Sequence, residues 1–238
     1  MTAGVLLTAM ALAWGGATPT GSLAEPRPVR PGAALQEEVP VLLVPGWSDT
    51  GRAMAALRIR LVSAGWAPER VAVLTFTDPA GGNRAHAREL GDSIDAVLAR
   101  TGADRLDVVA HSMGGLATRA YLRERGGGKV RRVAFLATPQ RGTLAAYLAF
   151  GRGRYDMMPD SPFLQWLNAG PPLPEGVEAL TVRTPLDAHV LPNESGTLEG
   201  VEDHVVCCPT HAGLIDSLEV FRLLRRFLED GPPTQGSA

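Results

Sequence analysis

Cysteine is almost absent from this sequence. Its 238 residues include two cysteines, Cys207 and Cys208, which are adjacent. Two cysteines cannot form a disulfide framework, and a bridge between neighbours would close a tight, strained ring. We therefore expect two small apolar strand residues and not a redox pair. No cluster of cysteines and histidines has the spacing of a zinc site, so the sequence predicts no bound metal.

An excess of one charge, long apolar segments and a nucleotide-binding motif are also missing. The chain has 23 basic and 25 acidic side chains, a formal net charge of −2 and no basic stretch. We therefore expect no nucleic-acid partner. Beyond the N-terminal region, no apolar run is long enough to form a transmembrane helix. No G-x-G-x-x-G motif follows a predicted strand, so the dinucleotide fingerprint is absent.

The N-terminal region has the features of a targeting segment. Residues 4–14 form an apolar run near the length of a signal-peptide core, and Ser22-Leu23-Ala24 offers a cleavage site with small residues. A basic segment before the apolar run is missing. The sequence predicts a signal peptide over 1–24, a linker rich in proline, glycine and charge over 25–38, and a secreted protein. Residues 231–238 are predicted to be a flexible tail.

The rest of the chain alternates between two hydrophobic patterns. Continuous apolar runs are typical of strands covered on both faces, whereas apolar residues at helical spacing indicate amphipathic helices. Strands are predicted at 39–44, 71–76, 106–110, 130–136, 179–182 and 205–208, and helices around 54–62, 90–98, 115–122 and 218–227. This alternation predicts one α/β domain over 39–230, with a mostly parallel sheet and helices on both faces.

One turn between a predicted strand and a predicted helix has the pattern of a nucleophile site. Ser112 follows the strand, with Ala110 two positions before it and Gly114 two positions after it. A nucleophilic serine in such a turn must stand on a sharp, strained backbone, where bulky side chains two positions away would collide. No other serine here has small residues at both positions. We therefore predict that Ser112 is a nucleophile.

A serine nucleophile needs a general base, and in strand–serine–helix hydrolases this is a histidine late in the chain. His211 lies in the loop after the last predicted strand, whereas His204 lies before that strand, at its opposite end. We expect His211 to be the base. The other histidines are His86 and His189, which we expect to be solvated surface residues, and His111, whose side chain should point away from that of Ser112.

The orienting acid and the oxyanion hole complete the predicted machinery. Asp187 follows the preceding strand and is the expected acid, whereas Asp203 competes from the wrong end of the last strand. The oxyanion hole should use the backbone N–H of Met113, the residue after the nucleophile. Its second donor should come from the loop after the first strand, where Gly46 allows close approach and Trp47 is the expected donor.

Residues 137–176 interrupt the alternation, because they are too many for a plain crossover. They hold two apolar clusters, 144–150 and 163–167. We interpret the segment as a cap or flap over the strand ends, with Phe163 and Trp166 binding the acyl part of a substrate. The alternative is a small satellite core beneath a static loop.

The motif Ala110-His111-Ser112-Met113-Gly114-Gly115 resembles the nucleophile turn of small bacterial triacylglycerol lipases in the α/β-hydrolase superfamily. The resemblance runs from Val39 to Leu228 and includes Val-Pro-Gly after the first strand, the sequence 137–143, the Asp187 loop and the four residues from His211. It implies an α/β-hydrolase fold and a secreted serine esterase or lipase that needs no redox cofactor. Two departures are Pro45, where many relatives have His-Gly, and the long 137–176 interval.

These observations favour a serine carboxylester hydrolase that acts on acylglycerols through a Ser-Asp-His triad and an acyl-enzyme. Its partner would be an ester or lipid substrate, which a lipid–water interface could present. Two alternatives remain open. One is an acyltransferase or peptidase that uses the same triad, and the other is a catalytically inactive hydrolase fold that serves as a binding module. Acyl chain length, stereoselectivity and oligomeric state are not predicted.

Overall fold

The computed structural model describes residues 39–231. The predicted signal peptide and linker, and the tail beyond residue 231, lie outside these residues. No helix in this part of the chain is both long and apolar enough to cross a membrane.

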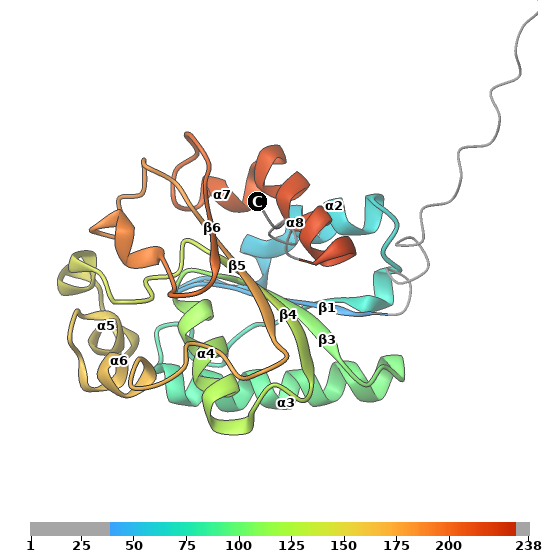
Figure 1. Ribbon diagram of the computed structural model, residues 1–238, viewed down its shortest axis with the longest axis horizontal. Coiled ribbons are helices and arrows are strands. Elements are labelled where there is room, and N and C mark those ends of the chain that lie inside the picture. Colours follow the sequence, from blue (N-terminus) through green and yellow to red (C-terminus); the bar gives the residue numbers. More distant parts are fainter. Residues whose placement is uncertain (1–38, 232–238) are drawn as a thin grey trace, which may run out of the picture. The chain divides into compact units, whose positions relative to one another are not determined.

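A six-stranded parallel sheet forms the centre of the fold (Figure 1). In chain order the strands are β1 (Val41–Val44), β2 (Val71–Val73), β3 (Leu106–His111), β4 (Val130–Leu136), β5 (Glu178–Arg183) and β6 (Glu202–Val205). Their order in the sheet is β2-β1-β3-β4-β5-β6, and every neighbouring pair is parallel. Parallel strands need crossover connections, which the helices provide. The predicted α/β class with a parallel sheet is confirmed.

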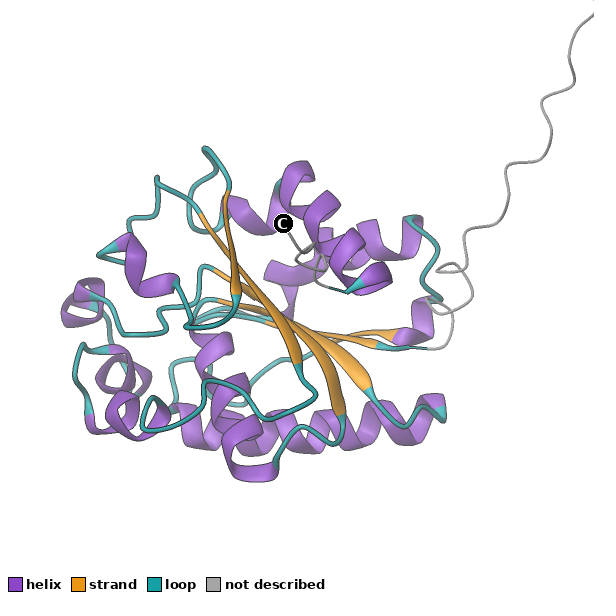
Figure 2. Ribbon diagram, in the orientation of Figure 1, coloured by secondary structure: helices purple, strands orange, loops and turns teal. Residues whose placement is uncertain are grey.

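Helices cover both faces of the sheet (Figures 1 and 2). One face carries α3 (Asn83–Thr101) and α4 (Met113–Arg125), and the other carries α2 (Ala55–Ser63), α7 (Gly213–Asp216) and α8 (Leu218–Asp230). Every residue of β1 and β3 is therefore buried. This double cover explains why these strands read as continuous apolar runs and not as alternating ones.

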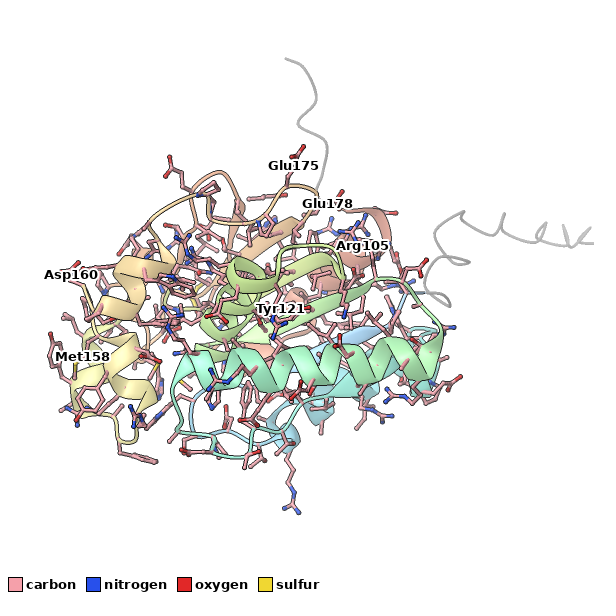
Figure 3. The ribbon with its side chains drawn as sticks, turned by 90° about the horizontal axis from the view of Figure 1, so that it is seen from below. Arg105, Tyr121, Met158, Asp160, Glu175 and Glu178 are labelled. Atoms are coloured by element: carbon pink, nitrogen blue, oxygen red, sulfur yellow. A yellow bond between two sulfur atoms is a disulfide. The ribbon has the colours of Figure 1, made fainter. Side chains whose placement is uncertain are left out.

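Local sequence signals account for the ends and faces of the helices. Ser217 caps α8 by accepting a hydrogen bond from the Val220 amide at 3.3 Å. Gly102 ends α3 in the left-handed conformation, with a φ of 70°. Tyr121 of α4, labelled in Figure 3, packs against Gly91 of α3, where an added Cβ would lie 3.2 Å from the tyrosine ring. A glycine in the middle of α3 thus makes room for the aromatic ring of α4.

The 137–176 segment contains the 3-10 helix η3 (Leu144–Leu148) and the short helices α5 (Gly153–Met157) and α6 (Pro162–Leu167). The buried guanidinium of Arg119 on α4 anchors it, donating to Gln140 Oε1 at 3.1 Å and to the carbonyl of Leu167 at 3.4 Å. Burial lowers the pKa of Arg119 to about 10. Hydrogen bonds from one buried group thus tie two separate parts of the segment to α4.

The last strand and the cysteines differ from the prediction. The expected strand over 205–208 lies instead at 202–205, because the ladder with β5 ends where Arg183 pairs with Val205. Cys207 and Cys208 fall in the exposed loop that follows, and a disulfide joins them. The prediction of two unlinked strand residues was therefore wrong. Once the chain leaves the sheet at Val206, the cysteines no longer pack as small apolar residues, and their sulfur atoms are free to bond.

A buried ion pair fixes the start of β4 against β3. Asp107 is 1% exposed and accepts a hydrogen bond from Arg131 Nε at 2.9 Å. Arg131 Nη2 also donates to the carbonyl of Leu228 at 3.0 Å, so the same guanidinium holds the end of α8. Burial raises the pKa of Asp107, although the hydrogen bond from Arg131 opposes the rise. Arg131 thus favours the ionised form of a carboxyl group whose burial disfavours its charge.

We expect Arg131→Met to destabilise the fold by about 3–5 kcal/mol, since it removes the guanidinium that pairs with a buried carboxyl group. The pKa of Asp107, already raised, should rise further, so the folded state of the variant should hold a proton that the unfolded state has released. Stability relative to wild type should therefore fall as pH rises from the ordinary pKa of an aspartate, about 4, toward neutral. Urea unfolding across this range measures it. Arg225→Met, which removes the exposed pair with Glu229, is the control and should cost under about 1 kcal/mol at every pH. A pH-independent loss in Arg131→Met would contradict the argument.

Candidate active site

The candidate residues gather at one edge of the sheet, because parallel strands all end on the same side. Val44 of β1 lies opposite Ala110 of β3, and His111 lies opposite Leu136 of β4. The loop after β1 therefore begins beside the turn at Ser112. The loops after β5 and β6 carry Asp187 and His211 to the same edge.

Ser112 stands in a backbone conformation that side chains rarely adopt, with a φ of 53° and a ψ of −128°. Such a conformation costs free energy and persists only where its surroundings enforce it. The Ser112 amide donates to the carbonyl of Leu136 at 2.8 Å, and its carbonyl accepts from Gly115 at 3.0 Å. Hydrogen bonds to β4 on one side and to α4 on the other hold the turn.

Two glycines let the loop after β1 approach this turn. A Cβ on Gly46 would lie 2.9 Å from the Cβ of Ser112, and a Cβ on Gly114 would clash with the carbonyl of Pro45. The small residue two positions after the serine is therefore required by the loop after β1. The next glycine, Gly115, leaves room for the side chain of Thr138.

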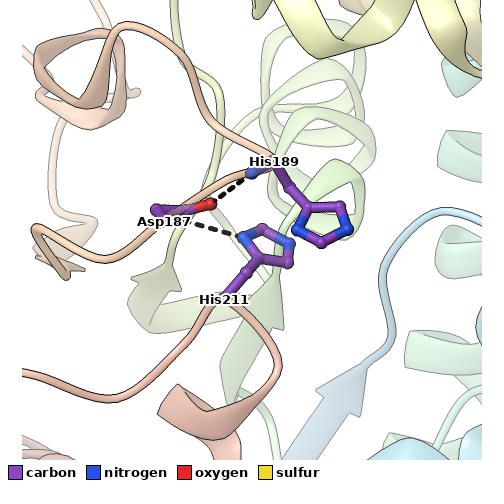
Figure 4. A group of neighbouring side chains, drawn as sticks. All are labelled: Asp187, His189 and His211. Carbon is purple, nitrogen blue, oxygen red and sulfur yellow. Dashed lines mark hydrogen bonds and ion pairs between the residues drawn. The ribbon is translucent and has the colours of Figure 1, made fainter.

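Asp187 and His211 form a buried hydrogen-bonded pair (Figure 4). His211 Nδ1 lies 2.8 Å from Asp187 Oδ2, while Asp187 Oδ1 accepts from the amides of His189 at 2.8 Å and Val190 at 2.9 Å. Burial alone would raise the pKa of Asp187. The hydrogen bond and charge of His211 and the two amides outweigh this effect and lower it. The carboxylate is therefore ionised and held against the imidazole.

A cavity of about 210 Å³ opens at this edge of the sheet, and both Ser112 and His211 line it. The other lining residues are Trp47, Asp49, His111, Pro139, Thr143, Ala145, Ala146, Ala149, Met157, His189 and Ala212. Within residues 39–231 no hydrogen bond joins the Ser112 hydroxyl to His211. Such bonds are often loose without substrate and shorten when substrate binds.

Trp47 and Met113, the predicted oxyanion-hole donors, belong to the two segments that meet at the serine: the loop after β1 and the start of α4. Met113 begins α4, where helix amides lack partners, and neither amide donates a hydrogen bond within the described part of the chain. The Trp47 ring is held separately, since its Nε1 donates to the carbonyl of Phe150 at 3.1 Å and its ring packs edge-on against the Phe150 ring at 4.6 Å. Two free amides next to a nucleophile can stabilise an oxyanion.

His111 lies behind His211 and stays uncharged. Its Nε2 lies 3.2 Å from the carbonyl of His211, and the centroids of the two rings are 4.7 Å apart. Complete burial, together with the nearby His211, lowers the pKa of His111 to about 3. A neutral imidazole here supports the loop of His211 without adding positive charge.

Comparison with protein families decides the assignment of the fold. Residues 40–178, more than half of the chain, match the alpha/beta hydrolase fold family. The chain belongs to the α/β-hydrolase family.

Solved structures, two of them of lipases, share this architecture. Lipase B of Aspergillus fumigatus matches with a TM-score of 0.72 and 19% identity, over 83% of this chain and 55% of that one. The mature lipase BlEst2 of Bacillus licheniformis matches with a TM-score of 0.69 and 14% identity, over 81% of this chain and 93% of that one. A gene product of Listeria innocua matches with a TM-score of 0.61 and 15% identity, over 81% of this chain and 94% of that one. This chain thus spans about half the length of the A. fumigatus lipase and nearly all of the two bacterial proteins.

Two histidines of this α/β-hydrolase lie where the sequence did not predict them. His86 is fully buried, and its ring stacks on that of Phe76 with 3.9 Å between the ring centroids. Its Nε2 lies 2.7 Å from the carbonyl oxygen of Asp78. The prediction that it is solvated was wrong, because the start of α3 turns its side chain inward. His189 is exposed as predicted, but its ring stacks on that of His211, with 4.7 Å between the ring centroids, and it lines the cavity. Its position two residues after Asp187 was the signal that sequence reasoning missed.

The competing acid and base lie away from the cavity. Asp203 accepts hydrogen bonds from the Thr181 hydroxyl at 2.7 Å and from Arg183 Nε at 2.8 Å, and it lies within β6 instead of before the last strand. His204, also in β6, pairs with Glu202 at 2.8 Å. Both side chains therefore have other partners at the far edge strand.

The two residues predicted to bind substrate do not reach this cavity. Phe163 is 7% exposed and belongs to the core cluster beneath α3 and α4. Trp166 lies under the guanidinium of Arg84, 3.7 Å from the ring centroid. Arg119 of α4 donates a hydrogen bond to the carbonyl at the end of α6, and the apolar cluster 163–167 packs against the core. The alanines of η3 and the residue after it line the cavity instead.

Proposed function

We propose that this α/β-hydrolase is a serine carboxylester hydrolase that acts on acylglycerols. The observation that carries the proposal is the buried pair of Asp187 and His211, with His211 lining the same small cavity as Ser112. A carboxylate, an imidazole and a serine in this arrangement are the parts of an acyl-transfer site.

In the proposed reaction His211 takes the proton from Ser112 as the serine oxygen attacks the ester carbonyl. Asp187 holds the His211 tautomer with its proton on Nδ1 and stabilises the imidazolium, without itself accepting the proton. The amides of Trp47 and Met113 bind the oxyanion. His211 then protonates the departing alcohol, and the same histidine activates the water that cleaves the acyl-enzyme.

The size and the rim of the cavity favour an acyl substrate. At about 210 Å³ it is smaller than the ~300–1,000 Å³ typical of ligand pockets, so it suits a short length of acyl chain next to the ester. Outside it, η3 and the following residues expose large apolar side chains: Leu144 at 56%, Tyr147 at 56%, Leu148 at 94% and Phe150 at 60%. A contiguous apolar rim of this kind can bind the rest of a chain or contact a lipid surface.

Secretion is part of the proposal. The N-terminal sequence favours it, and the disulfide between Cys207 and Cys208 is consistent with it, since disulfides persist mainly in oxidising compartments.

Ser112→Ala should lower the hydrolysis of a soluble ester by about a million-fold while the protein still folds. Turnover and covalent labelling by a fluorophosphonate measure the loss, and a melting curve checks the fold. Ser63→Ala, which changes an exposed serine of α2, is the matched control and should keep both turnover and labelling. Near wild-type activity in Ser112→Ala would overturn the proposed function.

Asp187→Asn should lower kcat by about four orders of magnitude, because the amide favours the wrong tautomer of His211. Asp203→Asn, which perturbs the contacts with Thr181 and Arg183, should leave kcat within about threefold of wild type and cost only stability. Steady-state kinetics of the two variants decide between the carboxylates. The reverse pattern would show that Asp203 orients the base.

Ala149→Leu should narrow the cavity and lower kcat/KM for long-chain esters at least about tenfold more than for acetate. Phe163→Ala should instead lower the free energy of unfolding by about 3–5 kcal/mol, as expected of a core phenylalanine, and leave the ratio of long to short esters unchanged. Measuring both quantities for both variants tests the cavity assignment. If only Phe163→Ala changed the ratio of kcat/KM for long and short esters, the acyl chain would instead bind at α6.

A further inference from the structure

Two histidines that line the cavity, His189 and His211, and the aspartate bonded to His211 together offer metal-ligand atoms. One such atom from each of Asp187, His189 and His211 lies within 4.8 Å of the other two. Figure 4 shows Asp187 on one side of the His211 ring and the His189 ring on the other. The His189 side chain is exposed, and within residues 39–231 its ring nitrogens have no hydrogen-bond partner. A free imidazole thus stands beside a fixed one.

The contact between His211 and Asp187 prepares the histidine for a metal. Histidines that ligate metals usually donate their other ring N–H to a carboxylate, which fixes the ring and raises the basicity of the ligand nitrogen. His211 Nδ1 lies 2.8 Å from Asp187 Oδ2, so Nε2 carries the free lone pair. This is also the lone pair that would accept the proton of Ser112. A metal bound there would compete directly with general-base catalysis.

The charges around the cavity also favour a cation. Its lining residues include the carboxylate of Asp49 but no lysine or arginine. Asp49 Oδ2 lies 4.0 Å from His111 Nδ1, and the Asp49 side chain lines the same cavity as His189 and His211. Asp187 adds a second negative charge behind His211. His111 stays neutral at the back of the cavity, because burial keeps its pKa at about 3.

We propose that His189 and His211 form a Zn²⁺ site at the mouth of the cavity, and that zinc bound there reversibly inhibits the enzyme. His211 Nε2 and a ring nitrogen of His189 are the direct ligands, Asp187 supports His211 from behind, and water or Asp49 completes the coordination. Imidazole nitrogens suit Zn²⁺, whereas Ca²⁺ and Mg²⁺ prefer oxygen ligands. The ions should therefore differ, with zinc inhibiting and calcium and magnesium having no effect. The inhibition rests on the proposed function, but the binding does not.

Zinc titration of ester hydrolysis tests the inhibition. Untagged enzyme is assayed in a buffer that does not bind zinc, and each variant is compared with its own metal-free rate. His189→Phe keeps an aromatic ring against His211 but removes a ligand, so it should raise the zinc concentration for half-inhibition at least about tenfold. His204→Gln, which changes a histidine of β6 paired with Glu202, should match wild type. Equal zinc sensitivity of His189→Phe and wild type would overturn the proposal.

Calorimetric titration of the Ser112→Ala variant with ZnCl₂ tests binding without relying on turnover. One zinc should bind per chain, and adding His189→Phe should weaken binding at least about tenfold. If the protein lacks esterase activity but these results hold, the proposed function fails and the metal site stands. Absence of zinc binding to Ser112→Ala overturns the site.

The cysteines need a separate check, because thiols also bind zinc. Cys207→Ser/Cys208→Ser should retain the zinc affinity of the parent protein, since the disulfide contributes no ligand. Loss of zinc binding in this double variant would reassign the metal to the thiols and overturn the proposal.

Discussion

Parallel pairing of β1, β3, β4 and β5 is the constraint on which the rest of the structure depends. It aligns the ends of strands that are far apart in sequence, so that the loops after them meet above one edge of the sheet. Ser112 comes from the turn after β3, Asp187 from the loop after β5 and His211 from the loop after β6. None of these side chains is near another in the sequence, and the sheet alone brings them to one cavity.

Close backbone approach turns this convergence into a site. Gly46 and Gly114 let the loop after β1 lie directly against the strained turn at Ser112. The strain at Ser112 is held by hydrogen bonds to Leu136 and Gly115, elements that the buried sheet makes rigid. The conformation of Ser112 is therefore maintained by the core.

The cavity has an apolar side and a charged side. Its outer side is apolar, built by η3 with its small alanines inside and its large side chains exposed. Its inner side is acidic and rich in imidazole, with Asp49, Asp187, His189 and His211 close together. An ester presents an apolar chain and a carbonyl that becomes an anion, so such a division suits it. The same acidic side explains why a cation should find ligands there.

The sequence by itself determined what depends on neighbours along the chain. Apolar runs located β1 and β4, and the small residues around Ser112, with the chain order of Asp187 and His211, nominated one candidate for each role. Tertiary structure alone decided what depends on distant partners. The ladder with β5 ends at Val205, so the last strand ends before Cys207 and Cys208, which a disulfide joins. Arg119 holds the end of α6 against α4, and Phe163 of α6 lies in the core. His189 reached His211 only because two loops fold together. Periodicity records which face of an element is buried, but not which element buries it.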